Sequence, residues 1–224
     1  MSPEYVYEWL NTKGIEVSDE MKAQLFAFHE KIYEANSIRN LTRVTSEDFW
    51  IRHFLDSLLF VDLFPIGARV LDIGTGPGFP AWPLAWARPD LKVTAIDSSG
   101  KMLDFLRSCP LENLEVVQTR AEEWKTEELF DVVTGRALAP LSTQLELSVN
   151  LCEINGVVIP MRSASDLGEI QRLKKNPFGL ELERVEEQTL PILEAERLFP
   201  LFRKTSPTPK RFPRSWAEMK RKPY

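Results

Sequence analysis

Disulfide frameworks and metal clusters are excluded first, because the residues that build them are scarce. The 224 residues include only two cysteines, Cys109 and Cys152, and two histidines. Two cysteines are too few for a disulfide framework, and their spacing matches no metal motif. We expect both thiols to be reduced and ordinary, and no metal to be bound.

Long apolar runs are also missing. No uninterrupted stretch approaches the roughly 18 apolar residues that a membrane-spanning helix needs, and residues 1–4 lack the basic and apolar parts of a signal peptide. The sequence therefore predicts a soluble cytoplasmic protein without a membrane partner. Hydrophobic residues make up 43% and charged residues 27%, which suits one globular domain with small terminal additions.

Positive charge is scarce except at the C-terminus. The net charge is -5, which alone argues against a nucleic-acid partner. Residues 203–224, however, hold eight basic residues and one acid, a local charge of +7, and the other 202 residues hold 20 basic and 32 acidic residues, or -12. A basic end on an acidic body is typical of a protein that touches an anionic polymer through that end. A solvated tail that only improves solubility is the alternative.

Hydrophobic periodicity divides the chain into two parts. Helical stripes are expected before Pro65, the last of them from Glu47 to Phe64. Short apolar strands then alternate with helices, which predicts an α/β fold with a mostly parallel sheet. The expected parallel strands are Arg69–Ile73, Lys92–Ile96, Leu114–Gln118, Asp131–Thr134 and Gly156–Met161, followed by an antiparallel pair, Leu180–Glu187 and Leu198–Lys204. We expect a helical extension (1–66), a core (67–205) and a basic C-terminal segment (206–224).

The first of these strands runs into a glycine-rich turn. Residues 70–80 read VLDIGTGPGFP, with glycines at Gly74, Gly76 and Gly78. Glycine permits unusual backbone conformations and close approach of a ligand, although three glycines could also make only a tight turn. The next strand ends in Asp97, 23 residues after Gly74. Its carboxylate is placed to accept hydrogen bonds from the hydroxyls of an adenosine ribose at the carboxyl ends of the strands.

The spacing within this turn distinguishes two classes of cofactor. The dinucleotide fingerprint is GxGxxG, whereas the glycines here are spaced GxGxG. A pyrophosphate also needs free N–H groups at the helix start, and Pro77 and Pro80 each remove one. S-adenosyl-L-methionine carries no phosphate and loses nothing by these prolines. The turn therefore favours S-adenosyl-L-methionine over a nicotinamide dinucleotide.

Two later turns fall at the same edge of the predicted sheet. Residues 120–123 (RAEE) follow the third strand, where they could clamp an adenine. An acidic helix N-terminus is an equally good explanation of that segment. Arg136, in the Gly135-Arg136-Ala137 turn after the fourth strand, can pair with the methionine carboxylate or with a substrate phosphate. A surface ion pair is the alternative role for this arginine.

A polar arc lies on the predicted helix just before the glycine turn. His53, Asp56 and Ser57 gather there, opposite a broad apolar face. A hydrogen-bonded cluster that ties the N-terminal helices to the sheet is the simpler role. A place in the cofactor pocket, or contact with the target nucleotide, is the alternative.

With these segments in place, the chain resembles the glucose-inhibited division protein B family, the 16S ribosomal RNA guanine-N7 methyltransferases. The resemblance runs through most of the chain. It rests on the segments Asn40-Leu41-Thr42, residues 52–58 (RHFLDSL), the glycine turn, Gly135-Arg136-Ala137 and Pro213-Arg214. The turn alone indicates only a common class of methyltransferase, whereas the His-x-x-Asp-Ser helix is far more specific.

The resemblance implies a fold, a reaction and a set of site residues. The fold is Rossmann-like, the class I S-adenosylmethionine-dependent methyltransferase fold: a mostly parallel seven-stranded sheet with helices on both faces, plus an N-terminal helical extension. The implied reaction is methyl transfer to N7 of a guanine in 16S, or small-subunit, ribosomal RNA. By similarity the cofactor-binding residues are Gly74, Phe79, Ala121, Glu122 and Arg136, to which the ribose argument adds Asp97.

The implied chemistry needs little from the protein beyond positioning. Guanine N7 has a lone pair outside the ring π system, so it can attack a sulfonium methyl group without losing a proton, and we nominate no catalytic residue. Phosphates are expected to meet Lys210, Arg211 and Arg214, with Phe212 available to stack on a base. The expected partner is 16S ribosomal RNA or the small subunit, and a monomer docking through its basic end is the simplest expectation.

Some positions depart from the family pattern. Ala81, Met102 and the pair Arg162-Ser163 replace a glycine, a lysine and a Lys-Gly pair, and a glycine usual near Trp216 is absent. These changes affect the RNA side more than the cofactor side. A methyltransferase of small molecules or proteins therefore stays open, as does a non-catalytic nucleotide-binding or assembly protein, because fold alone does not separate them.

Overall fold

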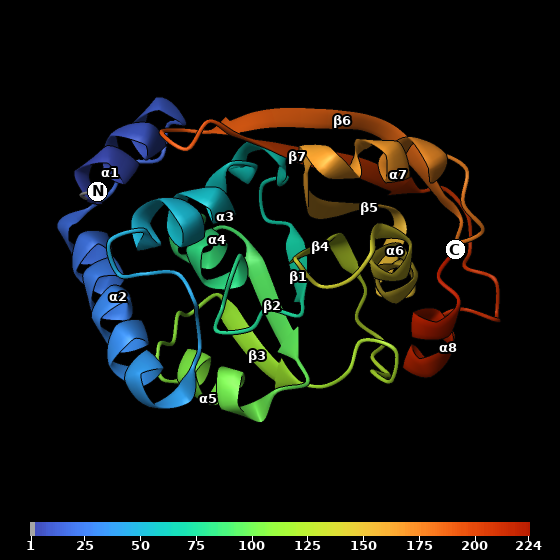
Figure 1. The fold of residues 1–224 in the computed structure, drawn as a ribbon, viewed down its shortest axis with the longest axis horizontal. Coiled ribbons are helices and arrows are strands. Elements are labelled where there is room, and N and C mark those ends of the chain that lie inside the picture. Colours follow the sequence, from blue (N-terminus) through green and yellow to red (C-terminus); the bar gives the residue numbers. More distant parts are fainter. Residues whose placement is uncertain (1–2) are drawn as a thin grey trace.

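The computed structural model describes residues 3–224, which form one seven-stranded sheet with helices on both faces (Figure 1). The strands are β1 (Arg69–Ile73), β2 (Lys92–Asp97), β3 (Leu114–Gln118), β4 (Phe130–Arg136), β5 (Cys152–Ser163), β6 (Leu180–Leu190) and β7 (Ala195–Lys204). They lie in the order β3-β2-β1-β4-β5-β7-β6. The first five pair in parallel, and β7 pairs antiparallel with both β5 and β6. The expected α/β fold and the closing antiparallel pair are confirmed.

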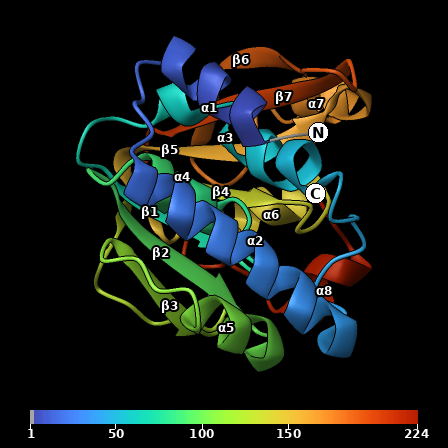
Figure 2. The same ribbon diagram turned by 90° about the vertical axis from the view of Figure 1, so that its left-hand side faces the viewer.

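The helices divide between the two faces of the sheet. They are α1 (Pro3–Thr12), α2 (Asp19–Arg39), η1 (Trp50–Leu55), α3 (Asp56–Leu58), η2 (Val61–Leu63), α4 (Ala81–Ala87), α5 (Gly100–Arg107), α6 (Leu141–Val149), η3 (Ala164–Asp166), α7 (Leu167–Arg172) and α8 (Trp216–Arg221). Successive strand residues point to opposite faces, so Val70 packs with the α1 to α5 layer while Leu71 packs with α6 and α7. Figure 2 shows α1 and α2 on the outside of the first layer. No helix among residues 3–224 is long and apolar enough to cross a membrane.

The continuous helix expected over residues 47–64 is broken into three short pieces. Trp50–Leu55 is a π-helix, because the Asp56 N–H reaches back to the carbonyl of Ile51. The hydroxyl of Ser57 donates to the carbonyl of His53 at 2.6 Å, within the same turn. Single π turns inside helices are frequent at functional sites, and this one presents His53 and Asp56 to the end of β4, where both contact Arg136.

Two glycines let strands and turns approach closely at the carboxyl edge of the sheet. A Cβ on Gly135 would lie 2.7 Å from the carbonyl oxygen of Ile73, so any other residue would push β4 away from β1. Gly74 has a φ of +72°, and a Cβ there would lie 2.5 Å from Leu138. The lack of a side chain at both glycines allows this close packing where β1 and β4 end.

The basic C-terminal segment is fastened to the sheet rather than free. Arg214 donates to the carboxylate of Glu146 on α6 from its backbone N–H at 2.8 Å and from its guanidinium at 2.6 Å, and Glu146 has no exposed surface. Phe212 is only 4% exposed and packs against Phe178 and Tyr224. The expectation that Phe212 stacks on an RNA base is therefore wrong, because its ring is part of the core.

The Arg214–Glu146 pair yields a prediction on stability. Replacing Arg214 with Met leaves a buried carboxylate without its partner, which should lower the free energy of unfolding by about 3–5 kcal/mol. Lys210→Ala, an exposed side chain of the same segment, should change it by no more than about 0.5 kcal/mol. Urea unfolding of the two variants measures both effects. Wild-type stability in Arg214→Met would show that the pair does not hold the segment.

Candidate functional site

The carboxyl ends of β1 to β3 enclose a cavity of about 210 Å³, which we call the β1–β3 cavity. Its wall is formed by residues 73–74, 96–98 and 119–122 from the three strand ends, together with Leu138, Leu147 and Trp216. The strand order reverses between β1 and β4, and ligands of open α/β sheets bind in the crevice at such a reversal. Of the six residues expected to bind the cofactor, this wall includes Gly74, Asp97, Ala121 and Glu122.

Asp97 organises the glycine turn and keeps room for a ligand. Its Oδ2 accepts the N–H of Gly76 at 2.9 Å, and its Oδ1 accepts the N–H of Ser99 at 2.8 Å. Each carboxylate oxygen has two lone pairs, so each can accept one further hydrogen bond. The two hydroxyls of a ribose present two such donors. Asp97 therefore fits the ribose role expected from the sequence.

Asp72, near the end of β1, is a residue of the site that was not predicted from the sequence. Asp72 is fully buried, and burial raises the pKa of its carboxyl to about 7. Its Oδ2 accepts the N–H of Ala81 at 3.1 Å, at the start of α4, while its Oδ1 has no hydrogen-bond partner among residues 3–224. Asp72 thus ties β1 to α4 across the glycine turn. A lone acid inside an apolar strand was the signal that could have identified it.

Phe79 lies behind the site rather than in its wall. Its ring is 3% exposed and stacks on His53, with 4.3 Å between ring centroids and 4° between planes. The guanidinium carbon of Arg136 lies 5.3 Å from the same ring. The Phe79 side chain supports residues of the site, and direct contact between Phe79 and the cofactor stays a prediction.

A second cavity, of about 400 Å³, adjoins the first, and we call it the arginine-lined cavity. Four arginines contribute to its wall: Arg52, Arg136, Arg162 and Arg197. The turn after β4 borders both cavities, since Arg136 and Ala137 face the second and Leu138 faces the first. Ala137 has a φ of +52°, an unusual conformation for a residue with a side chain, and one that often marks functional sites.

Arg136 is held by partners from the N-terminal region. Its guanidinium donates to Nδ1 of His53 at 3.1 Å, to Asp56 at 3.4 Å and to the backbone carbonyl of Arg52 at 3.2 Å. Asp56 also accepts a hydrogen bond from Arg197 at 2.7 Å. These contacts use three of the five N–H donors of Arg136. Two donors remain for an anionic ligand.

The same contacts fix the protonation of His53. A guanidinium can only donate, so Nδ1 of His53 must accept, and the proton of the neutral ring sits on Nε2, where it donates to the hydroxyl of Thr42. Burial and the adjacent charge of Arg136 lower the pKa of His53 to about 3. His53 and Asp56 of the predicted polar arc therefore tie the N-terminal helices to the sheet and also line the arginine-lined cavity.

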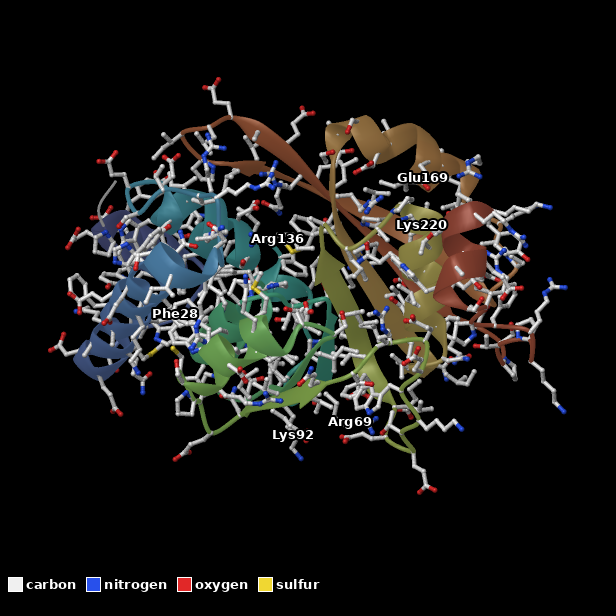
Figure 3. The ribbon with its side chains drawn as sticks, turned by 60° about the horizontal axis from the view of Figure 1, so that its bottom comes forward. Phe28, Arg69, Lys92, Arg136, Glu169 and Lys220 are labelled. Carbon is white, nitrogen blue, oxygen red and sulfur yellow. The ribbon has the colours of Figure 1, made fainter. Side chains whose placement is uncertain are left out.

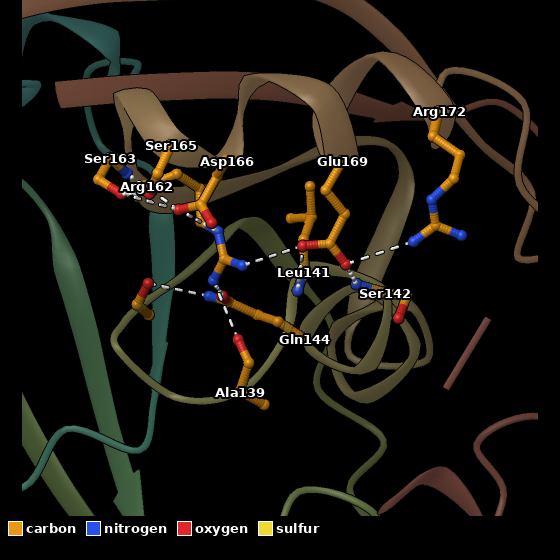
Figure 4. Close-up of polar contacts among 11 residues, drawn as sticks. Ala139, Leu141, Ser142, Gln144, Arg162, Ser163, Ser165, Asp166, Glu169 and Arg172 are labelled. Carbon is orange, nitrogen blue, oxygen red and sulfur yellow. Dashed lines mark hydrogen bonds and ion pairs between the residues drawn. The ribbon is translucent and has the colours of Figure 1, made fainter. Parts of the chain in front are cut away.

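Arg162, one of the departures from the family pattern, sits in a network of its own (Figure 4). It donates to the carbonyl of Ala139 at 3.0 Å and to the side chain of Gln144 at 3.4 Å. It also pairs with Asp166 at 3.4 Å and with Glu169 at 3.6 Å. These contacts join β5 to the start of α6 and to α7, so Arg162 braces one wall of the cavity.

The basic residues expected to meet RNA separate into two groups. Lys210 and Arg211 are exposed, and their contact with RNA stays a prediction. Arg214 has its guanidinium engaged by Glu146 and by the carbonyl of Lys222, so it anchors the segment, and its contact with an RNA phosphate stays a prediction. The sequence does not indicate this anchoring contact, because Glu146 is 68 residues away from Arg214 along the chain.

Sequence comparison identifies relatives that cover the whole chain. A sequence model described as GidB, rRNA small subunit methyltransferase G, matches residues 21–198. Proteins named ribosomal RNA small subunit methyltransferase G are 35% identical in Lactobacillus helveticus, over 100% of this chain and 99% of that protein, and 36% identical in Bacillus velezensis, over 92% and 91%.

Solved structures share the fold at lower identity. A TehB-like SAM-dependent methyltransferase from Corynebacterium glutamicum superposes with a TM-score of 0.53 at 19% identity, over 79% of this chain and 98% of that one. The N-methyltransferase NodS from Bradyrhizobium japonicum, in complex with S-adenosyl-L-homocysteine, gives 0.52 at 17% identity, over 80% and 98%. The fold is therefore that of the class I S-adenosylmethionine-dependent methyltransferases.

The neutral His53 ring makes a prediction on pH. Below pH 6.5, His53 becomes protonated in the unfolded chain, whereas in the folded protein it stays neutral until the pH falls to about 3. Stability should therefore fall with falling pH by up to about 1.4 kcal/mol per unit in this window. Asp72 acts with the opposite sign between pH 7 and 3.8, because its pKa is raised.

Comparing wild type with His53→Gln isolates the effect of His53 on stability, because Asp72 is present in both proteins and contributes equally to each. Urea unfolding from pH 7 to 4.5 should show wild type losing stability relative to the variant as pH falls. Parallel curves for the two proteins would contradict a neutral, buried His53.

Proposed function

The chain belongs to the GidB family of rRNA small subunit methyltransferases G, and from that premise we propose that it transfers a methyl group from S-adenosyl-L-methionine to N7 of a guanine in 16S ribosomal RNA. One observation carries the proposal: a cavity whose wall holds the carboxylate of Asp97 adjoins a cavity lined by four arginines. The family favours ribosomal RNA over a small-molecule or protein acceptor. We propose that the enzyme acts as a monomer.

The residues of the β1–β3 cavity fit S-adenosyl-L-methionine. Gly74, where a Cβ would fill space against Leu138, allows the close approach that a bound nucleoside needs. Asp97 would hold the ribose hydroxyls, and Ala121 and Glu122 the adenine. The two unused donors of Arg136, in the wall of the adjoining arginine-lined cavity, would hold the methionine carboxylate. When bound, this cofactor supplies an electrophilic methyl group on a sulfonium.

The protein's own contribution to the reaction is positioning. Guanine N7 attacks through its free lone pair, so no side chain has to remove a proton. His53 is accordingly not a general base, because its Nδ1 accepts a hydrogen bond from Arg136 and burial lowers its pKa to about 3. Holding two reactants in line can account for roughly 7–11 kcal/mol of barrier lowering in favourable cases.

The arginine-lined cavity suits the acceptor RNA. Its wall carries four arginines and two carboxylates, Asp56 and Asp166. From outside the wall, Asp48 pairs with Arg52 and Glu169 pairs with Arg162. Guanidinium groups bind phosphate oxygens in a bidentate geometry. We infer that this cavity holds the phosphates beside the target guanosine, with Arg162 fixing the wall. The exposed basic residues of the C-terminal segment would extend this contact along the RNA.

The proposed reaction is tested by methyl transfer. The enzyme is incubated with radiolabelled S-adenosyl-L-methionine and small subunits, or naked 16S ribosomal RNA, from a strain that lacks this protein, and the product is digested to nucleosides. Label in 7-methylguanosine at one site is expected. Binding of the cofactor without transfer to any ribosomal form, together with transfer to small molecules or proteins, would overturn the proposed acceptor.

The basic segment makes a separate prediction on RNA binding. Lys210→Ala with Arg211→Ala removes two proposed phosphate contacts, so the slope of log K against log salt should fall by roughly 1.4–1.8. Lys92→Ala is the control, because Lys92 starts β2, away from Lys220 of α8 and from Arg136 (Figure 3). Filter binding at several salt concentrations measures the slopes. Equal slopes for wild type and the double variant would make the segment a solubilising tail.

A further inference from the structure

One aromatic side chain faces the β1–β3 cavity, and it comes from the far end of the chain. Trp216, the first residue of α8, lines this cavity together with the strand ends and with Leu138 and Leu147. No other Trp, Tyr or Phe side chain is part of the described wall. Trp216 keeps 38% of its surface exposed. Single exposed apolar residues are ordinary on a protein surface, so what distinguishes Trp216 is that its ring borders the β1–β3 cavity.

The ring is held in place from both sides. Before it, Arg214 is locked to the buried Glu146, and the next residue of α6, Leu147, lines the same cavity. After it, Met219 is completely buried. The hydroxyl of Ser215 donates to the carboxylate of Glu218 at 2.6 Å. Its oxygen also accepts the Glu218 N–H at 3.4 Å, which caps the first turn of α8. Trp216 is therefore presented to the cavity by a fixed segment.

The surroundings indicate what the ring meets. Ala121 and Leu138 offer apolar surface in the same wall, and Asp97 offers a carboxylate for a ribose. An apolar wall with an aromatic ring suits a flat purine, because stacking on an aromatic side chain works for any base. The arginine-lined cavity contains no Trp, Tyr or Phe in its described wall, so the aromatic side chain belongs with the nucleoside part of the cofactor.

We propose that Trp216 stacks against the adenine of the cofactor, so that the basic C-terminal segment forms the outer wall of the cofactor site. This inference rests on the proposed function, since it assumes that the β1–β3 cavity binds S-adenosyl-L-methionine. One segment then holds both the exposed basic residues Lys210 and Arg211 and a residue that touches the cofactor.

The test measures binding rather than turnover. Titration calorimetry gives the Kd of S-adenosyl-L-homocysteine and of 5′-methylthioadenosine, which lacks the amino-acid part. Trp216→Ala should weaken both ligands by the same factor, roughly 5- to 100-fold, while Trp216→Phe should stay within about three-fold of wild type because it keeps a stacking ring. S-adenosyl-L-homocysteine should quench the tryptophan fluorescence of wild type and of Trp9→Phe, and most of this quenching should vanish in Trp216→Phe.

The outcomes separate the inference from the proposed function. Wild-type affinity in Trp216→Ala, or a loss for S-adenosyl-L-homocysteine alone, overturns stacking on the adenine and leaves the proposed function intact. Failure of the wild-type protein to bind either ligand overturns both. The half-exposed ring can be removed without opening the core, and Trp216→Phe provides a second variant if the alanine variant does not fold.

Discussion

A largely buried arginine at the end of β4, Arg136, sets the arrangement of the site. Burial lowers the pKa of Arg136, because its charge is removed from water, and such a charge is tolerated only where it is paired and hydrogen-bonded. The partners come from the N-terminal region: His53, Asp56 and the carbonyl of Arg52. Docking of these residues on the sheet is therefore coupled to the geometry of the crevice.

The need to pair the charge of Arg136 explains two irregular features of the fold, the π turn and the close approach of β4 to β1. The π turn at Trp50–Leu55 widens the helix where His53 and Asp56 reach Arg136. Gly135 lets β4 approach the carbonyl of Ile73, so that Arg136 emerges beside the glycine turn of β1. Both cavities then share the short turn that follows Arg136. Methyl transfer needs donor and acceptor side by side, and the cavities proposed for them share this turn.

Local signals in the sequence identified the parts of the site that depend on nearby residues. β1 and β3 begin and end at the residues predicted from their short apolar runs. Gly74 and Asp97 lie together in the cavity because a parallel sheet aligns the carboxyl ends of its strands. The remaining features depend on distant partners. The anchoring contact of Arg214 with the buried Glu146 joins residues 68 positions apart, which no local pattern indicates. The apolar stripe of residues 47–64 is the same for an α-helix as for a helix with a π turn. Trp216 could not be placed because α8 was not predicted.

The central claim is that the β1–β3 cavity binds the methyl donor next to an acceptor site lined by arginines. A crystal structure of the protein with S-adenosyl-L-homocysteine tests it most directly. The account predicts the ribose hydroxyls on the carboxylate of Asp97, the adenine beside Ala121, and the sulfur facing the arginine-lined cavity. Ligand density elsewhere on the protein, or a ribose that does not touch Asp97, would contradict it.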